Sequence, residues 1–320
     1  MKLKPLYSFL QGDISKIEKE LEQAIQSRSS LIEEASLHLL QAGGKRIRPV
    51  FVLLAGQFGN YNIETMKKVA VALEMIHMAS LVHDDVIDEA DLRRGRPTIK
   101  AKWNNRVAMY AGDFMMGRSL EVFTLIEKPK AHQILADTIV QVCIGEIKQI
   151  EDKYRFDQHL KDYLRRIKRK TALLIAASCQ IGAIAAEVDE DIHEKLYLYG
   201  YYVGMAYQIT DDILDFTGTE KQLGKPAGGD LLQGNITLPV LFARQNPEFR
   251  AKLEKVHENM DRNDLKEIID DLQTSGAIQK SWEVSNQYLQ KALKVLSTLP
   301  NNRANRTLKN IALYIGKRDY

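Results

Sequence analysis

Apolar residues recur at three- and four-residue spacing through most of the 320-residue chain, and this pattern constrains the fold more than any other feature. The spacing is that of an amphipathic helix, and no convincing run has the strict alternation that strands require. Most of the eight prolines fall near the ends of the periodic segments. The segments that we expect to be helical are 14–25, 63–87, 131–150, 160–186, 192–216 and 265–296.

The chain shows no division into independent domains. No low-complexity linker interrupts it, and its polar motifs are spread from Gly43 to Thr237. These motifs can act together only if the fold brings distant segments to one place. We therefore expect a single domain over residues 1–320, built as an all-α helical bundle around a central cavity.

Composition and charge argue against several classes of protein. The longest apolar stretch, 171–186, is shorter than a membrane span and contains polar residues, so it is expected to be a buried helix. The net charge of +3 is small, and the basic runs lack interleaved aromatic residues, which argues against a nucleic-acid partner. The first 13 residues contain no secretory signal. Cys143 and Cys179 lie in apolar stretches, so we expect reduced core thiols and a cytoplasmic location.

Two acidic clusters share the pattern Asp-Asp-x-x-Asp with apolar residues in the gaps. Residues four apart lie on one face of a helix, where like charges are destabilising unless a cation lies between them. Oxygen ligands that leave coordination positions open suit Mg²⁺, which keeps its waters and binds phosphate. Two such helices facing each other would hold several metal ions and a diphosphate. The clusters are Asp84, Asp85 and Asp88, and Asp211, Asp212 and Asp215.

Basic residues follow both acidic clusters in loops that contain glycine and proline. Arg93 and Arg94 come after the first cluster, and Lys225 comes after the second. Guanidinium groups are bidentate donors to phosphate, so metal ligands and phosphate donors would lie side by side. A third basic cluster, with Lys45 and Arg48, lies beside a glycine pair. Alone, each basic cluster would more often be a solvated surface than a binding site.

Five separate motifs occur along the chain in the order typical of the trans-isoprenyl diphosphate synthases, and the chain resembles that family. They include the pair Lys170-Thr171 and Gln208, and the resemblance continues beyond Thr237 by helical pattern. Within the family, the chain is most similar to the catalytic subunits of bacterial two-component heptaprenyl diphosphate synthases. The resemblance implies the type I isoprenoid synthase fold. It also implies Mg²⁺-dependent condensation of isopentenyl diphosphate with an allylic diphosphate, expected to be farnesyl diphosphate, to all-trans heptaprenyl diphosphate for the menaquinone side chain.

The resemblance also implies roles for individual residues. The six aspartates would hold Mg²⁺, with three ions in each active site. The expected contacts of the allylic diphosphate or its metals are Arg93, Lys170, Thr171, Gln208 and Lys225. The expected contacts of the isopentenyl diphosphate are Lys45, Arg48, His77 and Arg94. The residues expected to be catalytic are Asp84, Asp85, Asp88, Lys170, Asp211, Asp212 and Lys225.

The chain departs from the family pattern at Asn235, where many relatives carry a lysine. This change removes one cation near the second acidic cluster, so Asn235 is not assigned to diphosphate binding. At the C-terminus, Lys317-Arg318 has two interpretations, a cover over bound diphosphate and a frayed basic tail.

The residues before the first acidic cluster predict a long product. Relatives with short products tend to carry aromatic residues four or five positions before this cluster, where the chain has Ser80 and Ala79. One helical turn advances about 5.4 Å, so Ser80 is one turn and Ile76 two turns from Asp84. Without a bulky side chain at the first level, a tail of about six to eight prenyl units is expected by analogy. The alternative is that these small residues only pack helix against helix.

Four other functions have to be compared with this interpretation. A homodimeric hexaprenyl or octaprenyl diphosphate synthase shares every motif. A terpene cyclase of the same fold usually has a different second acidic motif and lacks the isopentenyl diphosphate set. A non-catalytic prenyltransferase-like subunit would have lost acidic residues, and this chain keeps all six. The small net charge of the chain argues against a nucleic-acid binder.

The expected partner is a small non-catalytic subunit, with a second copy of the chain as the alternative. The product is expected to leave at the membrane.

Overall fold

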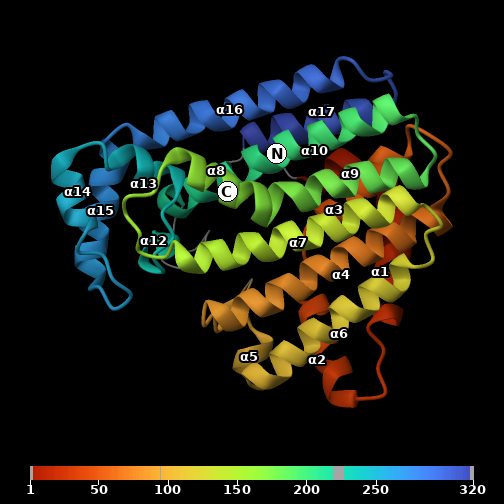
Figure 1. Cartoon of the computed structure of the whole chain (residues 1–320), viewed down its shortest axis with the longest axis horizontal. Coiled ribbons are helices and arrows are strands. Elements are labelled where there is room, and N and C mark those ends of the chain that lie inside the picture. The colour runs from red at the N-terminus through yellow and green to blue at the C-terminus, as the bar shows by residue number, and fades with distance from the viewer. Residues whose placement is uncertain (1–2, 94, 219–226, 318–320) are drawn as a thin grey trace.

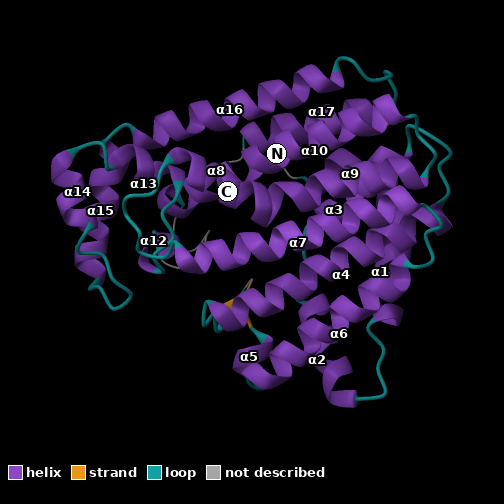
Figure 2. Ribbon diagram, in the orientation of Figure 1, coloured by secondary structure: helices purple, strands orange, loops and turns teal. Residues whose placement is uncertain are grey.

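The computed structural model describes residues 3–93, 95–218 and 227–317, and within them the chain is mostly helical with very little strand (Figures 1 and 2). The all-α prediction is therefore confirmed. The N-terminal half contains a 3₁₀-helix, η1 (Lys4–Leu10), followed by α1 (Gln11–Ala24), α2 (Ser30–Gln41), α3 (Ile47–Gly56), α4 (Ile63–Ile87), α5 (Ile99–Lys102), α6 (Asn105–Phe123) and α7 (Pro129–Glu151). The rest contains α8 (Leu160–Ile167), the π-helix η2 (Lys168–Ala172), α9 (Leu173–Ala185), α10 (Glu190–Thr217), α12 (Gly229–Leu232), α13 (Leu238–Ala243), α14 (Pro247–Leu253), α15 (Arg262–Thr274), α16 (Ala277–Leu296) and α17 (Arg303–Gly316).

The long helices lie alongside one another, and α9 is central among them (Figure 1). Nearly every residue of α9 is buried, which is typical of a helix that is apolar on all sides. It packs against α3, α4, α7 and α10. The contact with α10 is close because Gly200 and Gly204 face Ala176 and Ala172. A Cβ atom at Gly204 would lie 2.6 Å from the Ala172 Cα. This packing places the C-terminal part of α10 beside η2.

Asparagine side chains begin several of the helices. The Asn62 side chain accepts a hydrogen bond from the Glu64 amide at the start of α4, and Asn104 caps α6 through the Val107 amide. The expected helix over residues 63–87 matches α4, so the first acidic cluster lies at the C-terminal end of a capped, well-buried helix.

Two expected helices are divided in the structure. The segment 160–186 consists of α8, the π-helical η2 and α9. The segment 265–296 is broken between α15 and α16, where Gly276 adopts φ +77°, a left-handed conformation that suits glycine. The structure also contains a two-stranded antiparallel hairpin, β1 (Leu92–Arg93) with β2 (Arg96–Pro97), directly after the first acidic cluster.

The prediction that both cysteines are core thiols is wrong for Cys143. Cys179 is buried in α9, whereas Cys143 is exposed on α7. The apolar residues near Cys143 predicted a core position, but Val140, Ile144 and Ile147 on the same helix are themselves exposed and are not part of the core.

Among the described helices, none combines the length and the apolar character that a bilayer crossing requires.

Candidate active site

The first acidic cluster lies at the end of α4, where cations contact its carboxylates. Asp85 is buried, and its Oδ1 atom lies 2.7 Å from both Nε and Nη2 of Arg93 on β1. Burial raises the pKa of Asp85, and the Arg93 guanidinium opposes this rise. Asp88 Oδ1 lies 3.3 Å from Nζ of Lys153, in the loop after α7. The hairpin and the end of α7 thus each bring a cation to the cluster.

Asp84 faces a lysine that two side chains of α7 also hold. Lys170 Nζ lies 3.9 Å from Asp84 Oδ2, and it donates to Glu146 Oε2 at 3.3 Å and to Gln149 Oε1 at 3.0 Å. Burial raises the pKa of Asp84 to about 6; Lys170 opposes the rise, and Glu146 and Asp88 add to it. Burial alone would lower the pKa of Lys170, but the carboxylates of Asp84 and Glu146 raise it. Lys170 therefore remains a cation beside the first cluster.

The second acidic cluster lies near the end of α10 and centres on the buried Asp212. The Tyr163 hydroxyl on α8 donates to Asp212 Oδ2 at 2.7 Å, and Gln208 Nε2 donates to Oδ1 at 2.8 Å. Burial raises the pKa of Asp212 to about 7; Asp230 adds to the rise, and the two hydrogen bonds oppose it. The remaining members differ in exposure, because Asp211 is exposed and Asp215 is buried.

Asp215 connects the second cluster to the loop that follows it. Its Oδ2 accepts a hydrogen bond from the Asp230 amide at 3.1 Å, and its carbonyl oxygen accepts one from the Gly228 amide at 2.9 Å. Asn235 lies in the same turn, where its amide donates to the Asp230 carbonyl at 2.8 Å. Lys225 lies outside the described residues, as does Arg94 beside the first cluster.

The π-helix η2 connects the two clusters. Lys170 contacts Asp84, while the next residue, Thr171, donates to Gln208 Oε1 at 2.6 Å, and Gln208 in turn donates to Asp212. Lys170 thus contacts the first cluster, and Thr171 is linked to the second cluster through Gln208. π-Helical turns inside α-helices are rare and frequently occur at functional sites. The fold therefore brings the ends of α4 and α10 to the same turn, as the sequence predicts.

Carboxylates alone do not form a complete metal cage in the part of the chain that the structure describes. No three histidine, cysteine, aspartate or glutamate side chains converge there closely enough to hold an ion. The donor chemistry nevertheless suits Mg²⁺, which retains several waters and takes ligands from substrate phosphate rather than from a closed protein cage. The partly buried Asp84 and the buried Asp212 carry hard carboxylate oxygens with raised pKa values, and the Lys170 ammonium, which suits phosphate, lies 3.9 Å from Asp84.

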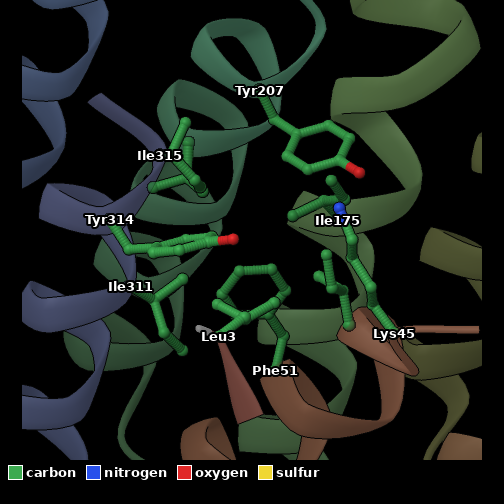
Figure 3. Close-up of a pocket in the computed structure, with 10 residues that line it drawn as sticks. Leu3, Lys45, Phe51, Ile175, Tyr207, Ile311, Tyr314 and Ile315 are labelled. Atoms are coloured by element: carbon green, nitrogen blue, oxygen red, sulfur yellow. The ribbon is translucent and has the colours of Figure 1, made fainter. Parts of the chain in front are cut away.

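The residues expected to bind isopentenyl diphosphate lie on α3 and α4. Arg48 and His77 are partly buried. The exposed Lys45 precedes α3, and its carbonyl oxygen accepts a hydrogen bond from the Tyr7 hydroxyl at 3.2 Å. Its side chain borders a small apolar pocket between the chain ends and α10 (Figure 3), and the other labelled residues of this pocket are Leu3, Phe51, Ile175, Tyr207, Ile311, Tyr314 and Ile315. The neighbouring Arg46 is structural, because it is buried against Glu74 at 3.1 Å.

The residues expected to set product length lie within α4. Ile76 and Ala79 are buried in the core, and Ser80 is partly buried with its hydroxyl donating to the His77 carbonyl at 2.8 Å. Small side chains thus lie about one turn before Asp84, and their role in setting product length stays a prediction.

Several polar residues of the site were not expected from the sequence. Glu146 and Gln149 hold Lys170, Lys153 contacts Asp88, and Tyr163 binds Asp212. The spacing of Glu146 and Gln149, three apart on one helix face, is a signal in retrospect. It is a weak one, because such pairs are common on exposed helices.

Comparison with known proteins agrees with this geometry. Residues 29–272 match the model of the polyprenyl synthetase family. The chain is 63% identical over 320 residues to heptaprenyl diphosphate synthase component 2 of Bacillus subtilis, covering 100% of this chain and 92% of that protein. A crystal structure of heptaprenyl diphosphate synthase from Staphylococcus aureus superposes with a TM-score of 0.94 at 46% identity, covering 97% of this chain and 99% of the other.

A second solved structure is similar over the same length. It is a polyprenyl synthase from Caulobacter crescentus complexed with calcium and isoprenyl diphosphate, with a TM-score of 0.94 and 31% identity, covering 99% of this chain and 98% of that one. The family model, the sequence identity over the whole chain and the similarity of fold all indicate the same family. The chain therefore belongs to the polyprenyl synthetase family and is a trans-polyprenyl diphosphate synthase.

Proposed function

We propose that this chain is the catalytic subunit of a two-component, Mg²⁺-dependent heptaprenyl diphosphate synthase. It condenses isopentenyl diphosphate with farnesyl diphosphate and supplies the side chain of menaquinone. The observation that carries the proposal is the convergence of both acidic clusters on η2. The relative from Bacillus subtilis supports the heptaprenyl product and the two components.

The six aspartates would hold three Mg²⁺ ions around the allylic diphosphate. The solved complex of the Caulobacter relative with calcium and isoprenyl diphosphate supports a divalent cation together with a diphosphate at this fold. When bound, Mg²⁺ neutralises charge that develops on the leaving diphosphate. Arg93 and Lys170 lie beside the first cluster and would bind the same phosphate oxygens. Thr171, Gln208 and Lys225 complete the proposed allylic set.

Isopentenyl diphosphate would bind at Lys45, Arg48, His77 and Arg94. The allylic C–O bond breaks and the diphosphate leaves with the bonding electrons. The isopentenyl double bond then attacks the allylic cation, and a proton leaves the adjacent carbon for the released diphosphate. Positive charge on Arg93 and Lys170 stabilises the leaving group throughout. The buried apolar part of α4 lies beside the growing tail and keeps water from the cation.

An exposed apolar face supports the second component as a partner. On α7, Val140, Ile144 and Ile147 lie on one side of the helix, and Ile147 is 57% exposed. On α6, Tyr110 is 60% exposed, with Leu120 three turns later. Exposed apolar side chains that share one side of a helix are typical of protein interfaces. We propose that the small subunit binds the exposed apolar side of α7, with the exposed apolar residues of α6 as a second contact.

The decisive assay sizes the products made from farnesyl diphosphate, isopentenyl diphosphate and Mg²⁺, with and without a candidate second component. We expect heptaprenyl diphosphate only when both proteins are present. Ile147→Lys should abolish this activity, whereas Leu313→Lys, which changes an exposed leucine on α17, should retain it. Full activity of the chain alone would indicate a homo-oligomer, and a hexaprenyl or octaprenyl product would support the homodimeric alternative. No product under any condition would contradict the proposed function.

The raised pKa values predict an unusual pH dependence of stability. In the metal-free protein, the pKa values of Asp84 and Asp212 are raised to about 6 and about 7, above their unfolded value of about 3.9. Their protonation therefore stabilises the folded state most below about pH 4, and this contribution is lost as the pH rises through about 6 to 7. Mg²⁺, which needs the ionised carboxylates, should restore stability mainly above that window.

Thermal unfolding of the parent and of Asp212→Asn, measured from about pH 5 to about pH 8 with and without Mg²⁺, tests this prediction. Without metal, the parent should lose stability relative to the variant as the pH rises. Parallel curves for the two proteins would show that burial does not raise the pKa of Asp212.

A further inference from the structure

The carboxylate of Asp212 is held at both oxygens by neutral donors from different helices. The Tyr163 hydroxyl on α8 donates to Oδ2 at 2.7 Å, and Gln208 on α10 donates to Oδ1 at 2.8 Å. Both Tyr163 and Asp212 are buried, with Tyr163 0% and Asp212 3% exposed. A buried carboxylate with one fixed donor on each oxygen has very little freedom to rotate.

Tyr163 is itself fixed by a buried arginine. The Arg166 guanidinium lies over the Tyr163 ring, 5.7 Å from its centroid. Arg166 also donates to Gln158 Oε1 at 2.8 Å and to the carbonyl oxygen of Ile236. Gln158 in turn donates to the Asp152 carbonyl at 2.8 Å. The phenol is therefore held between the end of α7 and the loop before α13, and its hydroxyl is directed at the acid.

Gln208 is fixed by η2. Thr171 donates to its Oε1 at 2.6 Å, which leaves the amide nitrogen directed toward Asp212. Because Lys170 contacts Asp84, the same π-helical turn holds side chains that reach both clusters. Tyr163 is fully buried, and it donates to the Asp212 oxygen that Gln208 does not contact.

We propose that Tyr163 is a positioning residue for the second metal cluster, holding the Asp212 carboxylate in the orientation that binds Mg²⁺ with diphosphate. This inference rests on the proposed function and extends it. Tyr163 acts through Asp212 and does not touch substrate. Hydrogen-bond donors behind metal ligands orient them, and their loss typically costs about 10- to 100-fold in metal affinity or activity.

The chain provides a matched control in Tyr199. It is also a fully buried tyrosine with one hydrogen bond, donated to the Leu308 carbonyl at 2.7 Å. Tyr163→Phe and Tyr199→Phe thus each remove one buried hydroxyl, and only the first leaves a carboxylate oxygen without this donor. Any general loss of packing or stability should affect both variants.

The test is calorimetric titration of Mg²⁺ into each folded protein in the presence of inorganic diphosphate, with the Mg²⁺ dependence of kcat measured alongside after the second component has been added. For Tyr163→Phe we expect the apparent Kd for Mg²⁺ to rise about 10- to 100-fold and kcat to recover at high Mg²⁺. For Tyr199→Phe we expect both values to match the parent. Circular dichroism establishes that each variant is folded.

An unchanged Mg²⁺ titration for Tyr163→Phe, or an equal shift in Tyr199→Phe, overturns the positioning role. If Tyr163→Phe fails to fold, Arg166→Lys, which loosens the Tyr163 ring and keeps the charge, should shift the Mg²⁺ titration in the same direction. No shift in a folded Arg166→Lys would then overturn the proposal. A parent that binds no Mg²⁺ with diphosphate would instead contradict the proposed function.

Discussion

Asp84→Asn should lower kcat by roughly 10³-fold or more, with the fold intact. The substitution keeps the size of the side chain and removes one negative charge, which we propose binds metal, from the first cluster. Metal ions contribute several kcal/mol to charge stabilisation in transition states, which corresponds to a rate factor of about 10³. Steady-state kinetics with farnesyl and isopentenyl diphosphates measures the effect. The folded state should be no less stable, because partial burial raises the pKa of Asp84 and makes its charge costly there.

Asp91→Asn is the matched control for this change. Asp91 follows the first cluster by three residues, and its side chain is 78% exposed in an ion pair with Lys100 at 3.4 Å. Exposed ion pairs contribute little to the stability of the fold. This variant should therefore remain folded and retain its activity within about twofold. An Asp84→Asn enzyme with the activity of the parent would contradict the role proposed for the first cluster.

Ser80→Phe should shorten the products to about three or four prenyl units. Ser80 lies one helical turn before Asp84 on the same face of α4, and an aromatic ring there would stop the growing tail at the first level. Chromatographic sizing of the products measures the change. Ala79→Tyr should shorten the products in the same way. Because Ala79 is fully buried, a tyrosine there also strains the core, which makes Ser80→Phe the cleaner variant.

Ser80→Ala separates chain length from packing. It removes the hydroxyl that donates to the His77 carbonyl and adds no volume, so its products should match those of the parent. If Ser80→Phe gave the same product ladder as the parent, the tail would not pass this level of α4, and the length-setting residues would lie elsewhere.

Local sequence patterns were sufficient to predict α4 and the acidic clusters. The apolar period of residues 63–87 and the Asn62 cap define the helix, and the three aspartates at its end follow directly. The resemblance to the family implied that Lys170 contacts the allylic diphosphate or its metals. The ion pair of Lys170 with Asp84, at 3.9 Å, was found only in the structure.

The divided helix over 160–186 was not predictable from local pattern. Its π-helical turn depends on tertiary packing, because Gly145 of α7 approaches the Arg169 side chain and Gly204 of α10 approaches Ala172. Tyr163 was missed for the same reason. A tyrosine on an amphipathic helix has the pattern of a core residue, and only the fold shows that its hydroxyl meets Asp212.

Anomalous diffraction from crystals grown with Mn²⁺ and a non-reactive farnesyl diphosphate analogue would locate the metal ions relative to both acidic clusters. We expect metal ions between the carboxylates of α4 and those of α10, bridged by one diphosphate that also contacts Lys170. Metal ions on only one cluster, or a diphosphate bound away from η2, would contradict it.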